Sequence, residues 1–393
     1  MARHRVIYQS EALYISQAIL STGMTQHVQL DRVQSANYSF TVNRQDINQF
    51  GELSRIGYVA LEPPTVNLDF TYYLTDGSNE RAMNFHVRNT GTSTNVDKTF
   101  LSGHMVSNYS GQNFYILTTI EGSDINSSTG EGSLGALTAN SKSAIGIGNA
   151  YITNYSLDAS IGNLPTVSVS FEGANMNAVT GVAYNTGVNF TGWSGLSLVS
   201  VDPAKGTSNS AANSGVFLPV GKANLGNSGV LALRPGDITL SLDQFDADSS
   251  GIFAKVSGTD AIHIQSAALS IPLARTPIQR LGTRFAYSRP LDLPASATLS
   301  VSAIVNEMTA ENLASSLDGI FEKDITLTIN NPGTSNAAVV YTLRKCRLDS
   351  ESFSSSIGAN KTVDLVFSTQ YASLNDTGRG VFMSGFSNVP LFS

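Results

Sequence analysis

Apolar and polar residues alternate with a period of two along several short stretches of the chain, as they do in β-strands with one buried face. In 38–42 the order is Tyr-Ser-Phe-Thr-Val, and in 66–72 it is Val-Asn-Leu-Asp-Phe-Thr-Tyr. Strand patterns also occur at 5–20, 114–120, 216–218, 230–233, 238–242 and 325–329. Helical patterns are short, one within 76–112 and one over 309–321, where Thr309 can cap the first turn. The pattern predicts a mostly β fold.

The first patterned region occurs twice. Residues 32–75 align without a gap on 263–306, at an offset of 231. Apolar residues match apolar residues while the polar positions between them differ, as expected where only the buried face is constrained. The matched pairs include Val33 with Ile264, Phe40 with Ile271, Arg44 with Arg275, Phe50-Gly51 with Leu281-Gly282, Pro63 with Pro294 and Leu68 with Leu299.

A second region repeats in the same order. Residues 145–171 align on 341–367 at an offset of 196, so the first copy holds about 35 more residues between its two repeated regions. The Gly/Ser-rich segment 121–143 is expected to hold most of them.

We interpret the chain as two tandem copies of one β-sandwich or barrel domain, each with a long inter-strand loop and a short flanking helix. The predicted domains are 1–200 and 215–393, with the Gly/Asn/Ser-rich stretch 172–214 at the boundary.

Each copy contains a connection of about twenty residues between its first two strands, at 43–64 and at 274–295. This exceeds an ordinary hairpin loop several-fold, so a fixed structural role is expected. Arg44 and Arg275 are aligned at the mouths of these connections. Two interpretations stay open for this pair: a solvated surface cation, or an ion-pair or hydrogen-bond anchor to another subunit.

Composition narrows the function classes. The chain is 41% hydrophobic and only 13% charged, which suits pleated surfaces and a subunit covered by neighbours. The net charge is −7 and no Lys/Arg cluster occurs, so a phosphate-gripping surface is not expected. The single Cys346 excludes an intramolecular disulfide, and its alignment with Ala150 predicts a small buried residue.

No motif carries catalytic or cofactor chemistry. Residues 246–251 resemble the start of a calcium loop, but Ser257 stands where a bidentate Glu is needed. The Ile-Gly-Ile-Gly run at 145–148 lacks the third glycine of a dinucleotide site. The five histidines share no metal-binding spacing, and no Gly-x-Ser-x-Gly elbow marks a nucleophile. The sequence predicts no enzyme, no metal and no cofactor. It also shows neither a signal-peptide pattern nor an apolar run long enough to span a membrane.

Four segments resemble major tail tube proteins, or closely related virion structural proteins, of tailed bacteriophages. They are RVIYQSEALYIS (5–16), RVQSANYSFTVNRQDINQFGEL (32–53), PPTVNLDFTYYLTDG (63–77) and NYSLDASIGNLPTVSVSFEG (154–173). The resemblance implies a β-sandwich or barrel with a flanking helix, whose sheets pair edge to edge into a ring around an inner β-barrel. It also implies that rings stack into a tube, with long loops and terminal arms reaching the next ring.

The resemblance implies a structural protein of the phage tail, made in the host bacterial cytoplasm, that forms a conduit for genome DNA. Because the domain is duplicated, three chains would supply a ring with pseudo-six-fold symmetry. The implied partners are further copies of this chain, the tape measure protein and the tail terminator or baseplate proteins, and no membrane. DNA would pass through the lumen without specific binding. The loop residues expected to contact other subunits or rings are Arg44, Asp46, Phe50, Glu52, Arg55, Arg275, Arg280, Arg284 and Tyr287.

Two alternatives remain open. A receptor- or glycan-binding β module would gather exposed aromatics in one concave site, and Tyr184, Phe190 and Trp193 form a candidate group. A tail-completion or capsid-decorating virion protein would share the assembly behaviour without forming a polymer.

Overall fold

The structure is a computed structural model of the 393-residue chain. The residues it describes are 11–17, 28–89, 98–106, 109, 111–118, 142–182, 201–202, 207–208, 233–242, 263–282, 285–305, 308, 313, 322–356, 360–371, 373 and 376–385. Over this part the fold is mostly β, which confirms the predicted fold class. One large sheet dominates, with short helical segments α1 (Ser78–Ala82), η2 (Ser102–His104) and η5 (Pro235–Asp237).

Two sets of strands pair in the same order. In the first set, the order is β3 (Val33–Thr41), β6 (Thr65–Tyr73), β10 (Thr166–Gly173) and β9 (Lys142–Ser160). In the second set it is β15 (His263–Pro272), β16 (Ser296–Ile304), β19 (Thr362–Gln370) and β18 (Ala337–Ser354). All these neighbours are antiparallel.

The long strands β9 and β18 each serve two layers. The first part of β9 pairs with β8 (Gln112–Thr118) and β11 (Asn175–Val182), and its second part pairs with β10. The first part of β18 likewise pairs with β17 (Lys323–Asn330) and β20 (Gly380–Gly385), before the strand joins β19. The outer layers are extended by β1 (Glu11–Gln17), β2 (Val28–Gln29), β14 (Ile238–Ser241) and β7 (Val87–Asn89), of which β7 is parallel to β20.

Irregularities in strand pairing fall at aligned positions. The register of β3 against β6 shifts between Val33 and Ser35, and that of β15 against β16 shifts between Ile264 and Ser266, 231 residues later. A β-bulge changes which face each following side chain occupies. Its repetition keeps the same face inward in both sets. The division into domains 1–200 and 215–393 stays a prediction, since much of the boundary lies outside the described residues.

The apolar positions of the alternating strands form the core. On β6, Leu68 and Phe70 are at most 1% exposed, whereas Asp69 between them is exposed. The Phe70 ring lies 5.8 Å from that of Phe114 on β8, and Phe114 lies 4.6 Å from Phe171 on β10. These contacts pack one layer on the other, as in a sandwich. One buried cluster continues through both halves of the chain and includes Cys346, which confirms the small buried residue expected there.

Segment 121–143 was expected to hold most of the extra residues of the first half, but the strand positions place more of them elsewhere. Residues 74–111 separate β6 from β8, 38 residues against the 18 of 305–322 between β16 and β17. The connection from β8 to β9 has 23 residues against 6 between β17 and β18. The segment containing α1, β7 and η2 therefore supplies the larger share, because it packs a further element against the core.

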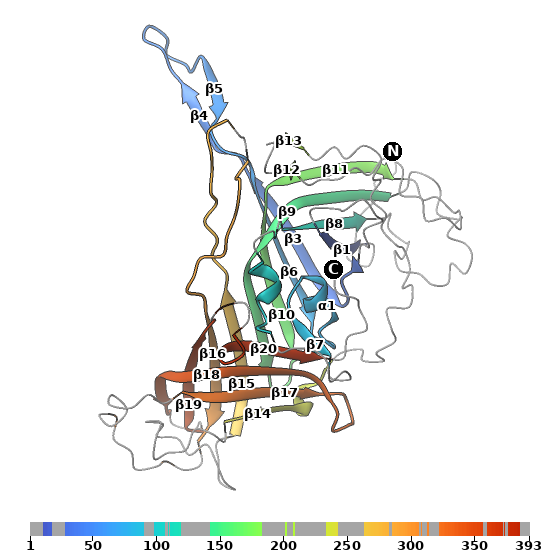
Figure 1. Ribbon diagram of the computed structural model, residues 1–393, viewed down its shortest axis with the longest axis vertical. Helices are drawn as coiled ribbons and strands as arrows, with labels where there is room; N and C mark the ends of the chain where they lie inside the picture. The colour runs from blue at the N-terminus through green and yellow to red at the C-terminus, as the bar shows by residue number, and fades with distance from the viewer. Residues whose placement is uncertain are drawn as a thin grey trace, which may run out of the picture.

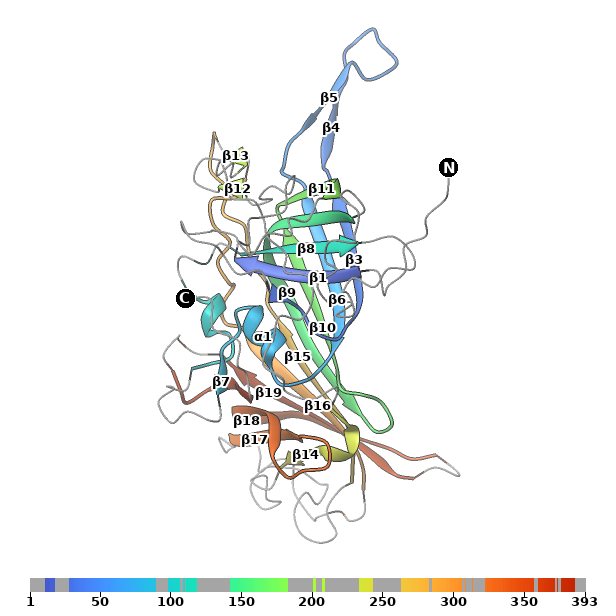
Figure 2. The same cartoon turned by 90° about the vertical axis from the view of Figure 1, so that its right-hand side faces the viewer.

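Two long connections leave the body in the same direction (Figures 1 and 2). The first contains an antiparallel hairpin of β4 (Arg44–Ile47) and β5 (Gly57–Ala60), which projects beyond the rest of the described chain. The second, between β15 and β16, has bridges at Arg275–Leu291 and Ile278–Ser288. A separate small ladder joins β12 (Val201–Asp202) to β13 (Thr207–Ser208).

Candidate assembly interface

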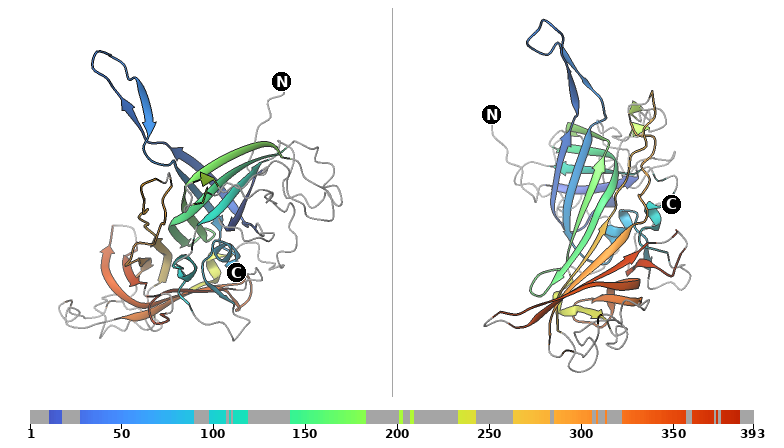
Figure 3. Two further views of the ribbon diagram at one scale, coloured as in Figure 1. Left: turned by 45° about the horizontal axis from the view of Figure 1, so that its top comes forward. Right: turned by 90° about the vertical axis from the view of Figure 1, so that its left-hand side faces the viewer.

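The two halves of the sheet meet where β9 pairs with β15. The antiparallel register runs from Ser160 opposite Ser266 to Asn154 opposite Pro272, and Figure 3 shows the two strands side by side. The core-facing side chains of this junction are at most 4% exposed: Tyr155, Leu157, Ala159, Ala267, Leu269 and Ile271. The junction thus joins two sets of strands into one sheet through an apolar seam.

Strand β3 aligns with β15 but has no strand beside its outer edge among the described residues, where it pairs only with β6. Tyr38, aligned with Leu269, is 43% exposed, and Phe40, aligned with Ile271, is 58% exposed. Leu269 and Ile271 are 1% and 0% exposed. An unpaired edge that shows apolar side chains is a template for pairing with another chain.

Among the described residues, the last part of β18 is a second open edge. Its residues 347–354 pair with β19 on one side, whereas β17 and β20 contact the earlier part of the strand. Residues 350–356 read Ser-Glu-Ser-Phe-Ser-Ser-Ser, with Glu351 as their one charged residue and no Lys or Pro. Phe353 is only partly buried, although the aligned Leu157 of β9 is 1% exposed.

The first long connection is held together by charge and aromatic contacts. The Arg55 guanidinium donates to the Asp46 carboxylate at 2.9 Å. The guanidinium carbons of Arg44 and Arg55 lie 5.1 and 5.5 Å from the centre of the Tyr58 ring. Such exposed contacts are individually weak, about 0.5–1 kcal/mol each. They stiffen the hairpin rather than tie it to the body.

The tip of this hairpin is apolar and open. Phe50 and Leu53 are fully exposed, and Gly51 turns the chain with a φ of 93°. The second connection repeats the arrangement, since Leu281 is fully exposed and Gly282 has a φ of 86°. An exposed leucine is ordinary, but aligned apolar tips on two projecting loops indicate a contact surface.

The second connection is anchored to the body through Arg275. Its guanidinium carbon lies 5.4 and 5.2 Å from the rings of Tyr109 and Tyr151. Its nitrogens donate to the carbonyls of Arg289 and His104 at 2.9 and 3.3 Å. Burial lowers the pKa of Arg275 from its usual value, and the neighbouring tyrosines oppose that shift. Arg275 is therefore an anchor within one chain, unlike Arg44.

A salt bridge secures the returning limb of the same connection. The Arg289 guanidinium donates to the Glu172 carboxylate of β10 at 2.7 Å. Its guanidinium carbon also lies 5.8 Å from the centre of the Tyr151 ring. Neither residue stood out in the sequence, because Glu172 and Arg289 are 117 positions apart and share no motif.

The structure gathers the predicted loop residues in two places. Arg44, Asp46 and Arg55 meet in the first hairpin, with Phe50 and exposed Glu52 at its tip. In the second connection the guanidinium carbon of Arg280 lies 5.3 Å from the Tyr287 ring, while Arg284 lies outside the described residues. Their contacts with other subunits stay predictions.

A buried polar cluster, which the sequence analysis missed, links the halves behind the junction. The Glu80 carboxylate accepts hydrogen bonds from the hydroxyls of Tyr72 at 2.6 Å and Tyr155 at 3.2 Å. The Tyr155 hydroxyl is also 2.8 Å from that of Tyr341 on β18. Burial raises the pKa of Glu80 to about 7, although the tyrosine hydrogen bonds oppose the rise. Burial therefore favours the neutral form of this carboxyl up to about pH 7.

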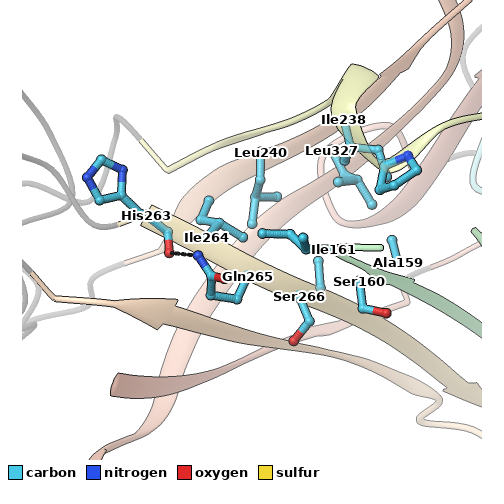
Figure 4. Close-up of a pocket in the computed structure, with 12 residues that line it drawn as sticks. Ala159, Ser160, Ile161, Ile238, Leu240, His263, Ile264, Gln265, Ser266 and Leu327 are labelled. Atoms are coloured by element: carbon cyan, nitrogen blue, oxygen red, sulfur yellow. Dashed lines mark hydrogen bonds between the residues drawn. The ribbon is translucent and has the colours of Figure 1, made fainter. Parts of the chain in front are cut away.

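One cavity lies between the paired ends of β9 and β15 and the strands β14 and β17 (Figure 4). It has a volume of about 430 Å³, and Leu240, Ile264 and Leu327 supply aliphatic walls. Among the twelve described residues that line it, His263 is the one titratable side chain. The cavity is therefore the open end of the space between two layers of strands.

Searches for known relatives gave little. No family model matches the chain, and no curated protein matches its sequence. A solved chain from a structure described as "Tail of empty GTA particle computed with helical refinement, C6 symmetry" is similar at 12% identity and a TM-score of 0.20. The match covers 32% of this chain and 96% of that one. A TM-score this low does not establish a common fold.

The described residues offer neither a metal-binding cluster nor a helix able to span a membrane. They contain no group of three or more His, Cys, Asp or Glu side chains placed to hold a metal ion. They also contain no helix with the length and apolar composition needed to cross a membrane.

Proposed function

We propose that this chain is a tail-related structural protein of a virion that assembles laterally into rings through the open edges of β3 and β18. The observation that carries the proposal is the β9–β15 junction. It is an internal example of the contact that β3 and β18 lack, between strands aligned with those two edges. A second copy of the chain offers each open edge its matching partner.

Ring closure follows from how the edges are used. Each copy has one β3 edge and one β18 edge, so the contact is head-to-tail. Successive copies are related by the same rotation, and the ring closes when these rotations add up to a full turn. If the two strand sets are copies of one domain, three chains supply six domains and pseudo-six-fold symmetry. Closure pairs both of these open edges, which protects them from uncontrolled aggregation.

Axial stacking is assigned to the two long connections. Both leave the body in one direction and end in exposed apolar residues, Phe50 and Leu281. Contact with the next ring would bury these tips. The tape measure protein and the tail terminator or baseplate proteins would be the other partners of this tube, and those at its ends would contact the loop tips of the last ring.

The face of the sheet away from the core suits a DNA conduit. It presents Asp69, Asp158 and Asp364 among serine and threonine side chains, and all three carboxylates are exposed. Carboxylates repel a phosphate backbone, so DNA would pass without being held. This face would line the lumen.

Negative-stain electron microscopy of the concentrated, purified chain tests the proposal. Hollow rings or tubes, with strong six-fold and weaker three-fold signal after rotational averaging, are the expected result. Discrete compact particles at every concentration, including after addition of virion assembly partners, would overturn it. The same images would then favour a non-polymerising binding module.

A further inference from the structure

The internal junction specifies more than the existence of a lateral contact, because it has a defined register. In it, Ser160 lies opposite Ser266 and Asn154 opposite Pro272. Strand β9 aligns with β18 at an offset of 196, and β15 aligns with β3 at an offset of 231. When these offsets are applied to the residue pairs of β9 and β15, each residue of 35–41 receives one opposite residue in 350–356.

We infer that β3 of one copy pairs antiparallel with β18 of the next, from Ser35 opposite Ser356 to Thr41 opposite Ser350. This inference rests on the proposed ring assembly and adds its residue-level geometry. Between the two ends, Asn37 faces Ser354 and Tyr38 faces Phe353.

The bulges support this register. Pairing of β18 with β19 shifts between Leu348 and Ser350, and pairing of β9 with β10 shifts at the aligned position. Residues 350–356 therefore present the same faces as residues 154–160, with no correction for an inserted residue. Strand β3 is therefore placed beside residues 350–356 as β15 is placed beside residues 154–160.

In this register the core-facing residues Ala36, Tyr38 and Phe40 lie opposite Ser355, Phe353 and Glu351, and the Tyr38–Phe353 pair supports it. Tyr38 is 43% exposed, and its partner Phe353 is partly buried. In the internal junction the aligned residues, Leu269 and Leu157, are each 1% exposed. The inferred contact brings two aromatic rings together as a cross-strand pair, a favourable combination in antiparallel sheets. A shift by one residue would instead set Tyr38 opposite Ser352 or Ser354, whose side chains point to the other face of the sheet.

The outward-facing side chains fit as well. Asn37 with Ser354 and Ser39 with Ser352 are small, uncharged pairs, and Asn37, Ser39, Ser352 and Ser354 are all exposed. Facing hydroxyl and amide groups can hydrogen-bond across an antiparallel pair. No like charges oppose each other there, so nothing in these pairs resists the second copy.

Disulfide trapping tests the register. The double variant Asn37→Cys with Ser354→Cys, in a Cys346→Ala background, is oxidised with copper phenanthroline and run on a non-reducing gel. Only facing residues bring their Cα atoms within the roughly 7 Å that a disulfide tolerates. The expected product is a ladder of covalent oligomers that ends at the size of the ring and collapses to monomer on reduction.

Three controls make the result decisive. Asn37→Cys with Ser352→Cys displaces one partner by two residues and should give little oligomer. Ala268→Cys with Asp158→Cys faces across the internal junction, so it should give a cross-linked monomer and report that the fold is intact. A mixture of the Asn37→Cys and Ser354→Cys single variants should stop at dimers, since each copy then carries one reactive edge.

The outcomes separate this inference from the function it rests on. Rings seen by microscopy without cross-linking at 37 and 354, or with stronger cross-linking of the displaced pair, would overturn the register and leave ring assembly standing. Absence of rings and of every intermolecular product, with the internal cross-link formed, would overturn both.

Discussion

Asn149 and Lys345 both hold a left-handed backbone conformation, with φ of 49° and 56°, in the middle of the two longest strands. They are 196 positions apart, the offset that aligns those strands. In each case the backbone N–H donates to a side-chain oxygen of a neighbouring strand, Asn113 Oδ1 at 3.1 Å and Asp324 Oδ1 at 3.0 Å. Both residues mark the point where a strand passes from one layer to the other. Left-handed conformations are uncommon outside glycine, so each bend is a specific device, built in the same way twice.

Removal of this acceptor should destabilise the second bend. Asp324→Ala leaves the Lys345 N–H without its side-chain partner, and we expect a loss of about 1–2 kcal/mol in the free energy of unfolding. Asp324→Asn keeps an acceptor oxygen at the same place and should retain most of the stability. Urea denaturation of both variants measures the difference, and equal losses would show that the hydrogen bond is unimportant.

The aligned arginines should respond differently to truncation. Arg275→Ala removes contacts with two tyrosine rings and hydrogen bonds to two carbonyls, so a loss of about 2 kcal/mol is expected. Arg44→Ala removes an exposed contact with Tyr58 and should cost less than about 1 kcal/mol. Thermal unfolding of the isolated chain compares the two. A larger effect at Arg44 would contradict the assignment of the anchor to Arg275.

The pH dependence of stability should report on Glu80. Its pKa is about 7 in the folded chain against an ordinary value of 4.5, because burial disfavours the charged form. Between these values the folded chain holds a proton that the unfolded chain releases. The stability that this group contributes is therefore complete below about pH 4.5 and is lost as pH rises through 7. The size is on the order of 3 kcal/mol.

Glu80→Gln should remove this pH dependence from the variant, so the difference in stability between the two proteins should follow the titration of Glu80. The variant gains stability relative to wild type as pH rises from 5 to 8, which urea titrations at several pH values measure. Tyr72→Phe removes a hydrogen bond that lowers the pKa of Glu80, so its loss of stability should extend to higher pH. A wild-type profile parallel to that of Glu80→Gln would show that the carboxyl is already ionised when buried.

Alternation and the internal repeat were sufficient to predict the mostly β class and most strand positions, since burial of one face constrains every second residue. Strand β6 is an example, with Leu68 and Phe70 buried on either side of exposed Asp69. The environments of individual polar residues were not predictable in this way. Glu80 accepts a hydrogen bond from Tyr155, which is itself bonded to Tyr341, and no local pattern marks a cluster of residues so distant in sequence.

The arginine pair shows where alignment stops being informative. The Arg275 guanidinium lies over the ring of Tyr151, which belongs to the first half of the chain. The residue aligned with Tyr151 in the second half is Arg347. An arginine offers no aromatic face of the kind that holds Arg275, so the aligned position gives Arg44 no equivalent site. The same residue at the same aligned position thus folds back in one loop and projects in the other.

The open edge and the hairpin tip should control two different steps of assembly. Phe40→Glu places a carboxylate on the edge of β3 opposite Glu351 of the next copy, and like charges in facing positions should prevent lateral pairing. Leu53→Lys changes a fully exposed side chain at the tip and should leave rings intact while shortening or abolishing tubes. Phe40 is itself 58% exposed, so both variants are expected to fold as the wild-type monomer does.

Size-exclusion chromatography with light scattering, followed by electron microscopy, distinguishes these steps. Because each tenfold change in an association constant corresponds to about 1.4 kcal/mol, loss of one buried edge contact should shift the ring population by at least about tenfold. Rings of Phe40→Glu at wild-type yield would remove β3 from the lateral contact. Loss of rings in Leu53→Lys would instead make the hairpin part of the ring, because a purely axial contact contributes nothing to closure.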